Sequence, residues 1–400
     1  MKIAIEGCCH GALDDIYFHI ASLEVQNNYK VDLLLICGDF QAIRNERDLQ
    51  CMAVPDKYRA LGGFYKYYTG EKNAPILTIV IGGNHEASNY FWELYHGGWI
   101  APNMFFLGHA GIFLSHDWPQ SIERHGNLHG LLKRKPYFKG DIETGSLGSP
   151  PMMGLLRTLK PEWWFSAHLH CRFEATVLHP DTEVVHEGAE TVVERNPDEI
   201  VIEDEGVEDE IPAAASAAQY VPGGTPAPAV VANPDEIVLD DEEEEVAKPP
   251  PPPPKPLETK FLALDKCLPR RQFLEVVDIP TGSSSPSPVI SYDPEWLAIT
   301  RAFNRYMSTN RPQLAYPDEA TAREAVQREL EWVKAHVFTD ATGASLEVKP
   351  VEDVQVFAKT APGPGEAEST GKVQPPHYPN PQTAAFCSML EIENKVDHVR

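Results

Sequence analysis

The chain has 400 residues, of which 42% are hydrophobic, and its formal net charge is −25 at pH 7. That length allows one large domain with appendages or two domains, and the apolar content is enough for a sizeable core. The charge is uneven, because residues 1–175 carry 16 basic and 18 acidic side chains whereas residues 176–256 carry 3 and 21. The acidity therefore does not exclude a polyanion as the partner of the N-terminal part.

The cysteine and hydropathy patterns predict a protein of a reducing compartment without a membrane span. The 7 cysteines show no paired spacing, and Cys8 and Cys9 are adjacent, so a disulfide framework is not expected. No run of about 18 apolar residues occurs, which argues against a transmembrane helix. The opening apolar stretch is too short for a signal peptide. We therefore expect a soluble intracellular protein.

Residues 1–180 alternate strand and helix patterns. Apolar residues at 13, 16, 17, 20 and 23 have helical spacing, with Asp14 and Asp15 near the expected start of that helix. Alternation of this kind predicts a layered α/β domain. Strand-length apolar runs, each ending in glycine or a polar residue, occupy Lys2–Gly7, Val31–Asp39, Ile76–Asn84, Gly111–Asp117 and Trp163–His170.

Residues 181–257 are predicted to be a disordered insertion, with an acidic run at 240–245 and consecutive prolines at 249–254. This composition buries too little apolar surface to offset the entropy of ordering. A pattern beginning Asn-Pro-Asp-Glu-Ile-Val occurs twice, and its β-branched runs at Ile200–Ile202 and Ile237–Leu239 resemble SUMO-interacting segments. They could add a strand to a partner's sheet edge. A duplicated solubilising stretch without a partner is the favoured interpretation.

Order resumes after the insertion, in a C-terminal domain predicted over residues 258–340. Phe261–Leu264 and Phe273–Ile279 have strand patterns on either side of a basic loop, and we expect them to complete the sheet of the first domain. Residues 293–338 have the pattern of two helices. The last segment, 341–400, is rich in Pro, Gly and Glu, so a flexible tail is expected there.

Short motifs rich in metal ligands stand at the ends of the strand-like runs. In open α/β sheets the carboxyl ends of strands meet at one edge, so residues far apart in sequence can converge on one pocket. The mixture of thiol, imidazole, carboxylate and amide donors is typical of a binuclear transition-metal site. Each motif alone is a weak signal, but together and in this order they predict a metal site. They are Cys8-Cys9-His10, Gly38-Asp39, Gly83-Asn84-His85-Glu86, Ser115-His116-Asp117 and His168-Leu169-His170.

The order of these motifs resembles the signature of the calcineurin-like metallophosphoesterases, with two departures. Cys8 stands where most members carry the first aspartate, and Ala167 stands where the last motif usually has glycine. Both departures are similar to the RNA lariat debranching enzymes, as are GCCHGALD at 7–14, GNHEASN at 83–89 and FLALDKCLPRRQFL at 261–274. The resemblance implies an αββα sandwich of two mixed sheets flanked by helices, with a small helical C-terminal region.

By the same resemblance, two divalent metal ions would share Asp39. Fe²⁺ or Zn²⁺ is expected natively because a thiolate is a soft ligand, and Mn²⁺ is expected to support activity. His85 would lie beside the metals without binding them and would act as the general acid. The first metal would be held by Cys8, His10, Asp39 and His170, and the second by Asp39, Asn84, His116 and His168.

The implied activity is hydrolysis of the 2′,5′-phosphodiester at the branch point of excised intron lariat RNA, which linearises the intron for turnover during mRNA processing. The implied partner is branched RNA, in the nucleus, with the enzyme a monomer. One alternative is another metallophosphoesterase. Protein phosphatases are disfavoured because the segment 38–44 lacks their Gly-Asp-x-x-Asp-Arg-Gly motif, and DNA nucleases are disfavoured by Cys8. A catalytically dead scaffold is disfavoured because every expected ligand is present.

Residues 125–151, between the fourth and fifth motifs, match the family's recognition loop, which covers the branch point. Basic and aromatic side chains are interleaved there, as suits phosphate contact with base stacking. A solvated charged loop is the alternative. Trp118 is expected either to line the pocket or to serve as packing. The expected RNA-binding residues are Lys133, Arg134, Lys135, Tyr137, Phe138, Lys139 and Trp118.

Overall fold

The computed structural model describes residues 1–108, 114–179, 258–279, 287–308, 313–340 and 342–397. Two predictions lie outside these residues. They are the disordered acidic insertion at 181–257, including both SUMO-like segments, and the first part of the strand expected over Gly111–Asp117. Among the described residues, no helix combines the length and the apolar content needed to cross a membrane.

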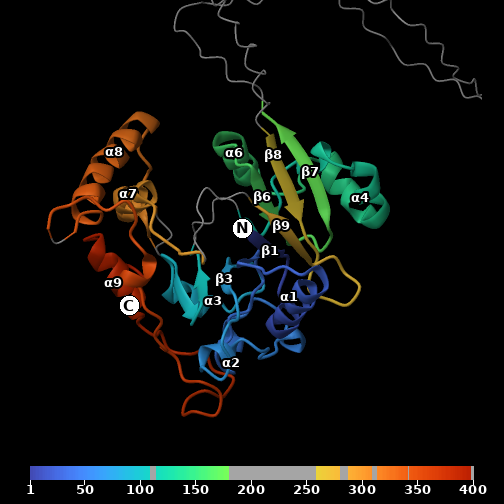
Figure 1. The fold of residues 1–400 in the computed structure, drawn as a ribbon, viewed down its shortest axis with the longest axis horizontal. Helices are drawn as coiled ribbons and strands as arrows, with labels where there is room; N and C mark the ends of the chain where they lie inside the picture. Colours follow the sequence, from blue (N-terminus) through green and yellow to red (C-terminus); the bar gives the residue numbers. More distant parts are fainter. Residues whose placement is uncertain (109–113, 180–257, 280–286, 309–312, 341, 398–400) are drawn as a thin grey trace, which may run out of the picture. The chain divides into compact units, whose positions relative to one another are not determined.

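One sheet has six strands in the order β4-β5-β3-β2-β1-β9. Figure 1 labels β3, β1 and β9 of this sheet. Strands β1, β2, β3 and β5 are parallel neighbours, whereas β4 and β9 run antiparallel at the two edges. The register pairs Glu6 with Ile36 and Ile36 with Val80, so β1, β2 and β3 end level with one another. The first three predicted strand runs are confirmed. The strands are β1 (Lys2–Glu6), β2 (Leu33–Ile36), β3 (Leu77–Val80), β4 (Gly98–Ala101), β5 (Met104–Phe106) and β9 (Leu274–Asp278).

The second sheet has three strands in the order β6-β8-β7, which are β6 (Trp163–Ser166), β7 (Phe173–Leu178) and β8 (Glu258–Ala263). β8 follows the insertion, yet it lies between two strands that precede the insertion, and β9 pairs with β1. The prediction that these late strands complete the first domain is confirmed. Leu178 of β7 pairs with Glu258 of β8. The residues before and after the insertion therefore lie at the same end of this antiparallel pair.

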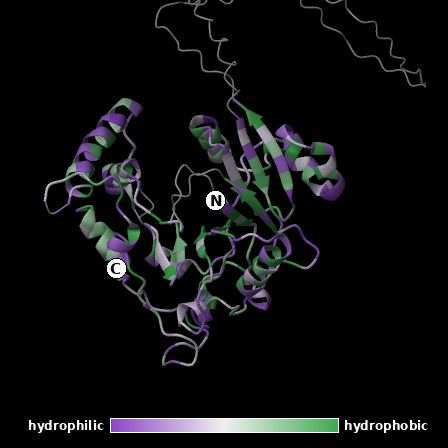
Figure 2. Ribbon diagram, in the orientation of Figure 1, coloured by the Kyte–Doolittle hydropathy of each residue, from purple (hydrophilic) through white to green (hydrophobic). Residues whose placement is uncertain are grey.

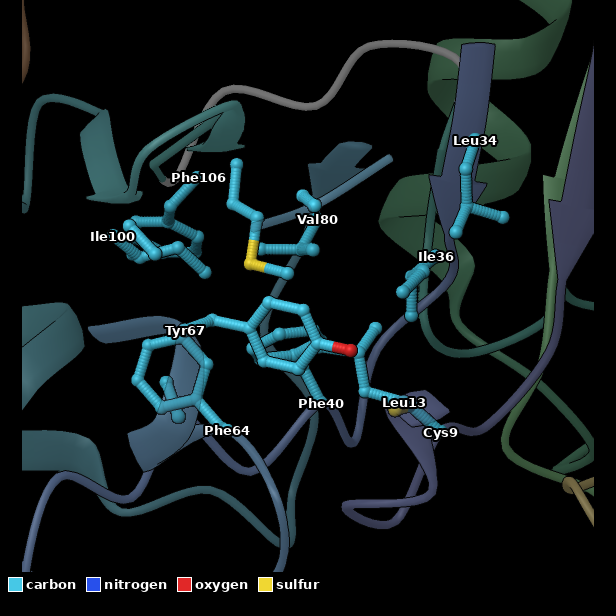
Figure 3. Close-up of a cluster of buried hydrophobic side chains, with 14 of the residues drawn as sticks. Cys9, Leu13, Leu34, Ile36, Phe40, Phe64, Tyr67, Val80, Ile100 and Phe106 are labelled. Atoms are coloured by element: carbon cyan, nitrogen blue, oxygen red, sulfur yellow. The ribbon is translucent and has the colours of Figure 1, made fainter. Parts of the chain in front are cut away.

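Alternating side chains of β1 join the six-stranded sheet to a different layer on each face. Ile3 and Ile5 lie in a buried cluster with Phe165 of the second sheet. Ala4 points the other way, into a cluster with side chains of α1 (Leu13–Asn27). Successive side chains of a strand face opposite sides, so one short strand contributes to two cores. Figure 3 shows the core on the helix side, which gathers Leu13, Leu34, Ile36, Phe40, Phe64, Tyr67, Val80, Ile100 and Phe106.

The outer face of the second sheet is covered by helices α4 (Leu128–Arg134) and α6 (Pro150–Leu159). Phe261 and Ala263 of β8 are buried among side chains of both helices. Leu262, which stands between them in the sequence, faces the first sheet. The layers therefore run helix, sheet, sheet, helix, and the predicted αββα sandwich of two mixed sheets is confirmed.

Shorter helices occupy several connections. α2 (Tyr65–Tyr68) and α3 (Ser88–Glu93) lie on either side of β3 in the sequence, and α5 (Lys139–Glu143) follows α4. α3 begins directly after the Gly83–Glu86 motif and so ends the loop that carries this motif. The recognition segment 125–151, expected as a loop, contains α4, α5 and the start of α6 and is therefore largely helical.

Three further helices, α7 (Pro294–Phe303), α8 (Glu319–His336) and α9 (Pro381–Met389), share one buried cluster. The two helices predicted over 293–338 are confirmed as α7 and α8. Figure 2 shows mostly hydrophilic residues along α8, as expected of a helix that buries only a narrow apolar stripe against its neighbours. The small helical C-terminal region is thus present, and α9 extends it beyond the predicted limit.

The described residues 342–397 are not the flexible tail that the sequence predicts. They contain α9, and two of their glutamines, Gln355 and Gln382, are 1% exposed. Gln382 exchanges two hydrogen bonds with the backbone of Trp99 in the edge strand β4, and Gln355 donates to the carbonyl of Gly97. These side chains give hydrogen-bond partners to backbone groups at the edge of the sheet that would otherwise be unpaired. Composition misled the prediction because a Pro- and Gly-rich segment can be ordered by polar partners on a neighbouring surface.

Arg44 connects the segment after β2 to this C-terminal region. Its side chain is fully buried, at 0% exposure, and pairs with Asp48 at 2.9 Å and with Glu93 at 2.9 Å. It also donates to the hydroxyl of Thr360 at 3.0 Å, and the ring of Tyr90 lies 4.2 Å from its guanidinium carbon. Thr360 in turn donates to Glu93 at 2.7 Å. The network is closed, so each buried charge has a partner.

Replacing Arg44 by alanine is expected to destabilise the fold by about 3–5 kcal/mol, because the carboxylates of Asp48 and Glu93 are then buried without a cation. The free energy of unfolding in urea measures the loss. Arg323→Ala is the control, since its ion pair with Glu319 lies at the surface, where such pairs contribute little. A loss for Arg44→Ala no larger than that of the control would contradict the importance of the network.

Candidate metal centre

The ligand-rich motifs gather at the carboxyl ends of the parallel strands. Because β1, β2 and β3 end level, the turns that follow them are neighbours. The second sheet brings its own motif to the same place, where the amide of Ala167 donates to the carbonyl of His116 at 3.0 Å. The turn after each strand carries the candidate ligands: Cys8 and His10 follow β1, Asp39 follows β2, Asn84 and His85 follow β3, and His168 and His170 follow β6.

One group of donors consists of Cys8, His10, Asp39 and His170, whose candidate ligand atoms all lie within 4.8 Å of one another. Nε2 of His10 is 3.4 Å from Nε2 of His170 and 3.5 Å from Oδ2 of Asp39. Sulfur, nitrogen and oxygen atoms thus converge from three separate turns. This set is the one that the sequence assigns to the first metal, and its donor types fit a divalent transition-metal ion.

A second group surrounds the other oxygen of Asp39. Nε2 of His116 is 3.3 Å from Oδ1 of Asp39 and 3.0 Å from Oδ1 of Asn84, and the ring of His168 lies 4.9 Å from that of His116. Nδ1 of His116 donates to the carbonyl of Cys37 at 2.9 Å, which directs Nε2 at the two oxygens. A proton on Nε2 can make these contacts without a metal, and a divalent cation would take the place of that proton, so this group also fits a metal ion.

Asp39 is common to both groups and gives one carboxylate oxygen to each. Burial acts to raise its pKa, but the hydrogen bond and charge of His116, the amide of His85 and the charge of His10 hold the pKa of Asp39 well below its usual range. The amide of His85 donates to Oδ1 at 2.9 Å. The carboxylate is therefore ionised at any physiological pH, as a bridging ligand must be.

Several of these side chains are attached to strained backbone. His10, Asp39, His168 and His170 all have positive φ angles, between 46° and 60°. A non-glycine residue in this left-handed region costs on the order of 1–3 kcal/mol, and such residues cluster at functional sites. Gly83 is required beside them, since a Cβ there would lie 2.3 Å from Oδ1 of Asp39. The strained backbone conformations therefore occur at residues of the two donor groups.

Glu86 is a positioning residue that the sequence analysis missed. Its buried carboxylate accepts hydrogen bonds from the amides of Phe40 at 2.6 Å and Gln41 at 2.7 Å, which directly follow Asp39. Burial and the negative charge of Asp39 raise the pKa of Glu86 to about 8. Glu86 therefore fixes the turn that presents Asp39. The one sequence feature that could have indicated this role is the position of Glu86 at the end of the Gly83–Glu86 motif.

The imidazole rings are mostly neutral near physiological pH, as metal ligands must be. Burial lowers the pKa of His10, of His168 and of His170, the last to about 4. His116 is the exception, because burial acts to lower its pKa but the hydrogen bond to Asp39 and the charge of that carboxylate raise it. The neutral rings have lone pairs available for a cation.

Cys8 keeps its proton unless a cation is bound. Burial raises the pKa of its thiol, and the negative charges of Asp39 and Glu6 raise it further. The amide of His168 donates to Sγ at 3.2 Å, which opposes the shift only in part. A metal ion at this group would displace the proton, because the thiolate is the form that binds metals.

Comparisons with known proteins agree with this geometry. Residues 1–172 match the family of calcineurin-like phosphoesterases, and residues 256–395 match the lariat debranching enzyme C-terminal domain. The chain is 37% identical to the lariat debranching enzyme of Drosophila pseudoobscura pseudoobscura, over 98% of this chain and 77% of that protein. It is 35% identical to that of Arabidopsis thaliana, over 99% and 88%, and 34% identical to that of Homo sapiens, over 98% and 69%.

The chain belongs to the lariat debranching enzyme family. Membership in the calcineurin-like phosphoesterases implies divalent metal ions, and the two donor groups that share Asp39 are where this debranching-family chain would hold them. Cys8, which stands where most calcineurin-like phosphoesterases are expected to carry aspartate, lies in the first of these donor groups.

The recognition segment of this debranching-family chain presents basic and aromatic side chains to solvent. The half-buried Lys135 lies with its ammonium 5.8 Å from the ring centroid of Tyr137, and its positive charge contributes to the lowered pKa of His170. The segment thus lies close enough to the metal centre for its charges to act there. The predicted RNA-binding residues that are exposed are Lys133, Arg134, Tyr137 and Lys139.

Trp118 and Phe138 are buried, so the prediction that they contact RNA is wrong, and for Trp118 the alternative of packing is confirmed. Trp118 is 0% exposed, its indole NH donates to the carbonyl of Ala167 at 2.9 Å, and its ring stacks on Phe173 at 5.1 Å. Phe138 is 6% exposed and belongs to the same buried cluster. Both residues pack in the hydrophobic cluster beneath the recognition segment. Trp118 fixes the backbone directly before His168.

Binding of Zn²⁺ to the metal-free protein is expected to release about one proton more from the native chain than from Cys8→Asp, because the thiol is protonated whereas an aspartate is already ionised. Calorimetry in two buffers with different ionisation enthalpies, near neutral pH, counts the protons. Cys9→Ala is the control and should match the native chain, because Cys9 is buried in the apolar core. Equal proton release from the native chain and Cys8→Asp would exclude Cys8 as a ligand.

Proposed function

We propose that the chain hydrolyses the 2′,5′-phosphodiester at the branch point of excised lariat RNA, in the nucleus, where introns are removed. The observation that carries the proposal is the pair of donor groups joined by Asp39, with the thiol of Cys8 in one of them. The named relatives are lariat debranching enzymes over nearly the whole chain. A metal pair suits a diester, which needs charge neutralisation and an activated water.

The two donor groups would hold one divalent cation on each side of Asp39. Bound there, the cations would neutralise charge on the phosphate and lower the pKa of water. We propose Fe²⁺ or Zn²⁺ as the native ions, since the thiolate of Cys8 favours them over Mg²⁺, with Mn²⁺ able to support activity. The chain's own contribution is orientation, because Glu86 fixes the Asp39 turn and the carbonyl of Cys37 fixes the ring of His116.

His85 is the proposed donor of a proton to the leaving 2′-oxygen. Its ring is 36% exposed, so substrate can reach it, and Nδ1 lies 3.8 Å from Oδ2 of Asp39. The ring centroid is 5.3 Å from that of His10, so His85 lies beside the donor groups, but it is not one of the four residues whose ligand atoms lie within 4.8 Å of one another. Imidazole exchanges protons near neutral pH, and a departing alkoxide needs one.

A branched RNA and a linear 3′,5′-linked RNA of the same sequence distinguish debranching from general phosphodiesterase activity. With Mn²⁺ supplied, we expect cleavage of the branched substrate at its 2′,5′ bond, leaving a 2′-hydroxyl on the branch nucleotide and a 5′-phosphate on the released strand. The linear RNA should remain intact. Gel electrophoresis and mass spectrometry identify the products. Cleavage of both RNAs at equal rates would reject debranching in favour of a general phosphodiesterase.

His85→Ala is expected to lower kcat on branched RNA by about 10²–10⁴-fold, because the leaving oxygen loses its proton donor. Metal content, measured by mass spectrometry, should equal that of the native protein, since His85 belongs to neither donor group. His336→Ala, at an exposed position of α8, is the control and should retain the native rate. Loss of metal together with activity would instead make His85 a ligand.

A further inference from the structure

The connection between β8 and β9 is fastened to the turn that carries Cys8. The amide of Cys8 donates to the carbonyl of Asp265 at 3.4 Å, and the amide of Cys267 donates to the carbonyl of Cys8 at 3.2 Å. A Cβ on Gly7 would lie 2.1 Å from the carbonyl oxygen of Asp265, so only glycine permits this approach. Lys266, which forms a parallel bridge with Cys8, is therefore held beside a proposed metal ligand.

Lys266 carries a charge that its surroundings do not neutralise. Its side chain is half-buried, and its sequence neighbour Asp265 is already paired with Arg271 at 3.3 Å. Within the ranges that the structure describes, the Lys266 ammonium makes no ion pair and no hydrogen bond with another side chain. A partly desolvated ammonium without a counter-charge is a favourable place for an anion.

The charge of Lys266 acts on one edge of the metal centre. Burial is the main cause of the lowered pKa of His10 and of His170, and the positive charge of Lys266 lowers the pKa of both further, whereas the carboxylate of Asp39 acts to raise it. The main charges that act on His116 and His168 belong instead to acidic side chains and other histidines. The bridge to Cys8 and these effects thus place a positive charge, that of Lys266, on the side of His10 and His170, which we call the cationic edge, although Asp39 acts there with the opposite sign.

A branch nucleotide presents two phosphodiesters on adjacent oxygens of one ribose. When the 2′,5′-phosphodiester lies at the donor groups, the vicinal 3′,5′-phosphodiester lies directly beside them, and a second negative charge must be accommodated. A cationic edge attracts that charge, whereas an edge governed by acids repels it. Lysine suits this task, because its ammonium is a compact point charge on a flexible stem.

We infer that Lys266, on the loop fastened to Cys8, binds the 3′,5′-phosphodiester that is vicinal to the scissile bond. The inference rests on the proposed function and names the feature of the branch that the site recognises. Lys135 of the recognition segment is the second cation at this edge. A linear 2′,5′ linkage contains the same scissile bond but no vicinal phosphate, so it leaves Lys266 without its ligand.

The test compares branched RNA with a 2′,5′-linked dinucleotide that has a free 3′-hydroxyl. In Lys266→Ala, the ratio of kcat/KM on branched RNA to that on the dinucleotide should fall about 10- to 100-fold, the loss expected for one charged hydrogen bond. Lys266→Arg should keep most of the ratio, because the charge is retained. Arg270→Ala removes an exposed cation from the same connection and should leave the ratio at its native value.

An unchanged ratio in Lys266→Ala would overturn the inference. An equal loss on both substrates would also overturn it, because Lys266 would then act on the scissile phosphate or through the support of Cys8. A fall of the same size in Arg270→Ala would show a general charge effect and would overturn it as well. The salt dependence of KM on branched RNA gives a second readout, since its logarithmic slope should decrease by about one in Lys266→Ala.

Failure of the proposed function is distinguishable from failure of this inference. If the native protein does not cleave branched RNA, debranching is rejected. Fluorescence anisotropy then measures the binding of branched RNA and of the dinucleotide to the native chain and to Lys266→Ala. Weaker binding of branched RNA alone by the variant would support Lys266 as the ligand of the vicinal phosphate, and equal binding by both proteins would overturn it.

Discussion

Both donor groups depend on one buried carboxylate. Asp39 lies at the end of β2, between the ends of β1 and β3 in the sheet, so ligands from either neighbouring turn can reach it. Its left-handed backbone and the hydrogen bonds of Glu86 to the two following amides set the direction of the carboxylate. A buried charge of this kind requires compensation. Hydrogen bonds from His116 and from the amide of His85 supply part of it, and the bound cations would supply the rest.

The turn that carries Asp39 continues into the segment that binds the C-terminal region, through Arg44 and Thr360. The two family matches therefore meet in one structural unit. β8 and β9 fall within the second match, yet they complete the sheets of the first, and the connection between them is fastened to Cys8. This arrangement gives a physical reason for finding both regions in one chain, because neither sheet is complete without the second region.

Local charge at the site differs from the net charge of the chain. The excess of acid lies mainly in residues 176–256, whereas the positive charges of Lys135 and Lys266 help to lower the pKa of His170 at the metal centre. Electrostatic attraction between exposed charges decays over about 8–10 Å at ordinary ionic strength. Under the proposed function, cations close to the donor groups would contribute to the seating of a branched polyanion, whatever the net charge of the whole chain.

The sequence by itself determined a layered α/β domain, the strands β1, β2 and β3 and the ligand-rich motifs that follow them, because apolar periodicity and motif residues are local signals. The αββα layering and the division of the ligands into two groups followed from the resemblance of those motifs to a known family. Tertiary structure alone decided what each remaining residue contacts. Trp118 and Phe138 look like RNA-stacking side chains in sequence, but the cluster beneath the recognition segment buries them. Lys266 lies beside Cys8 because β8 enters the sheet between β6 and β7, and no pattern of nearby residues encodes that long-range pairing.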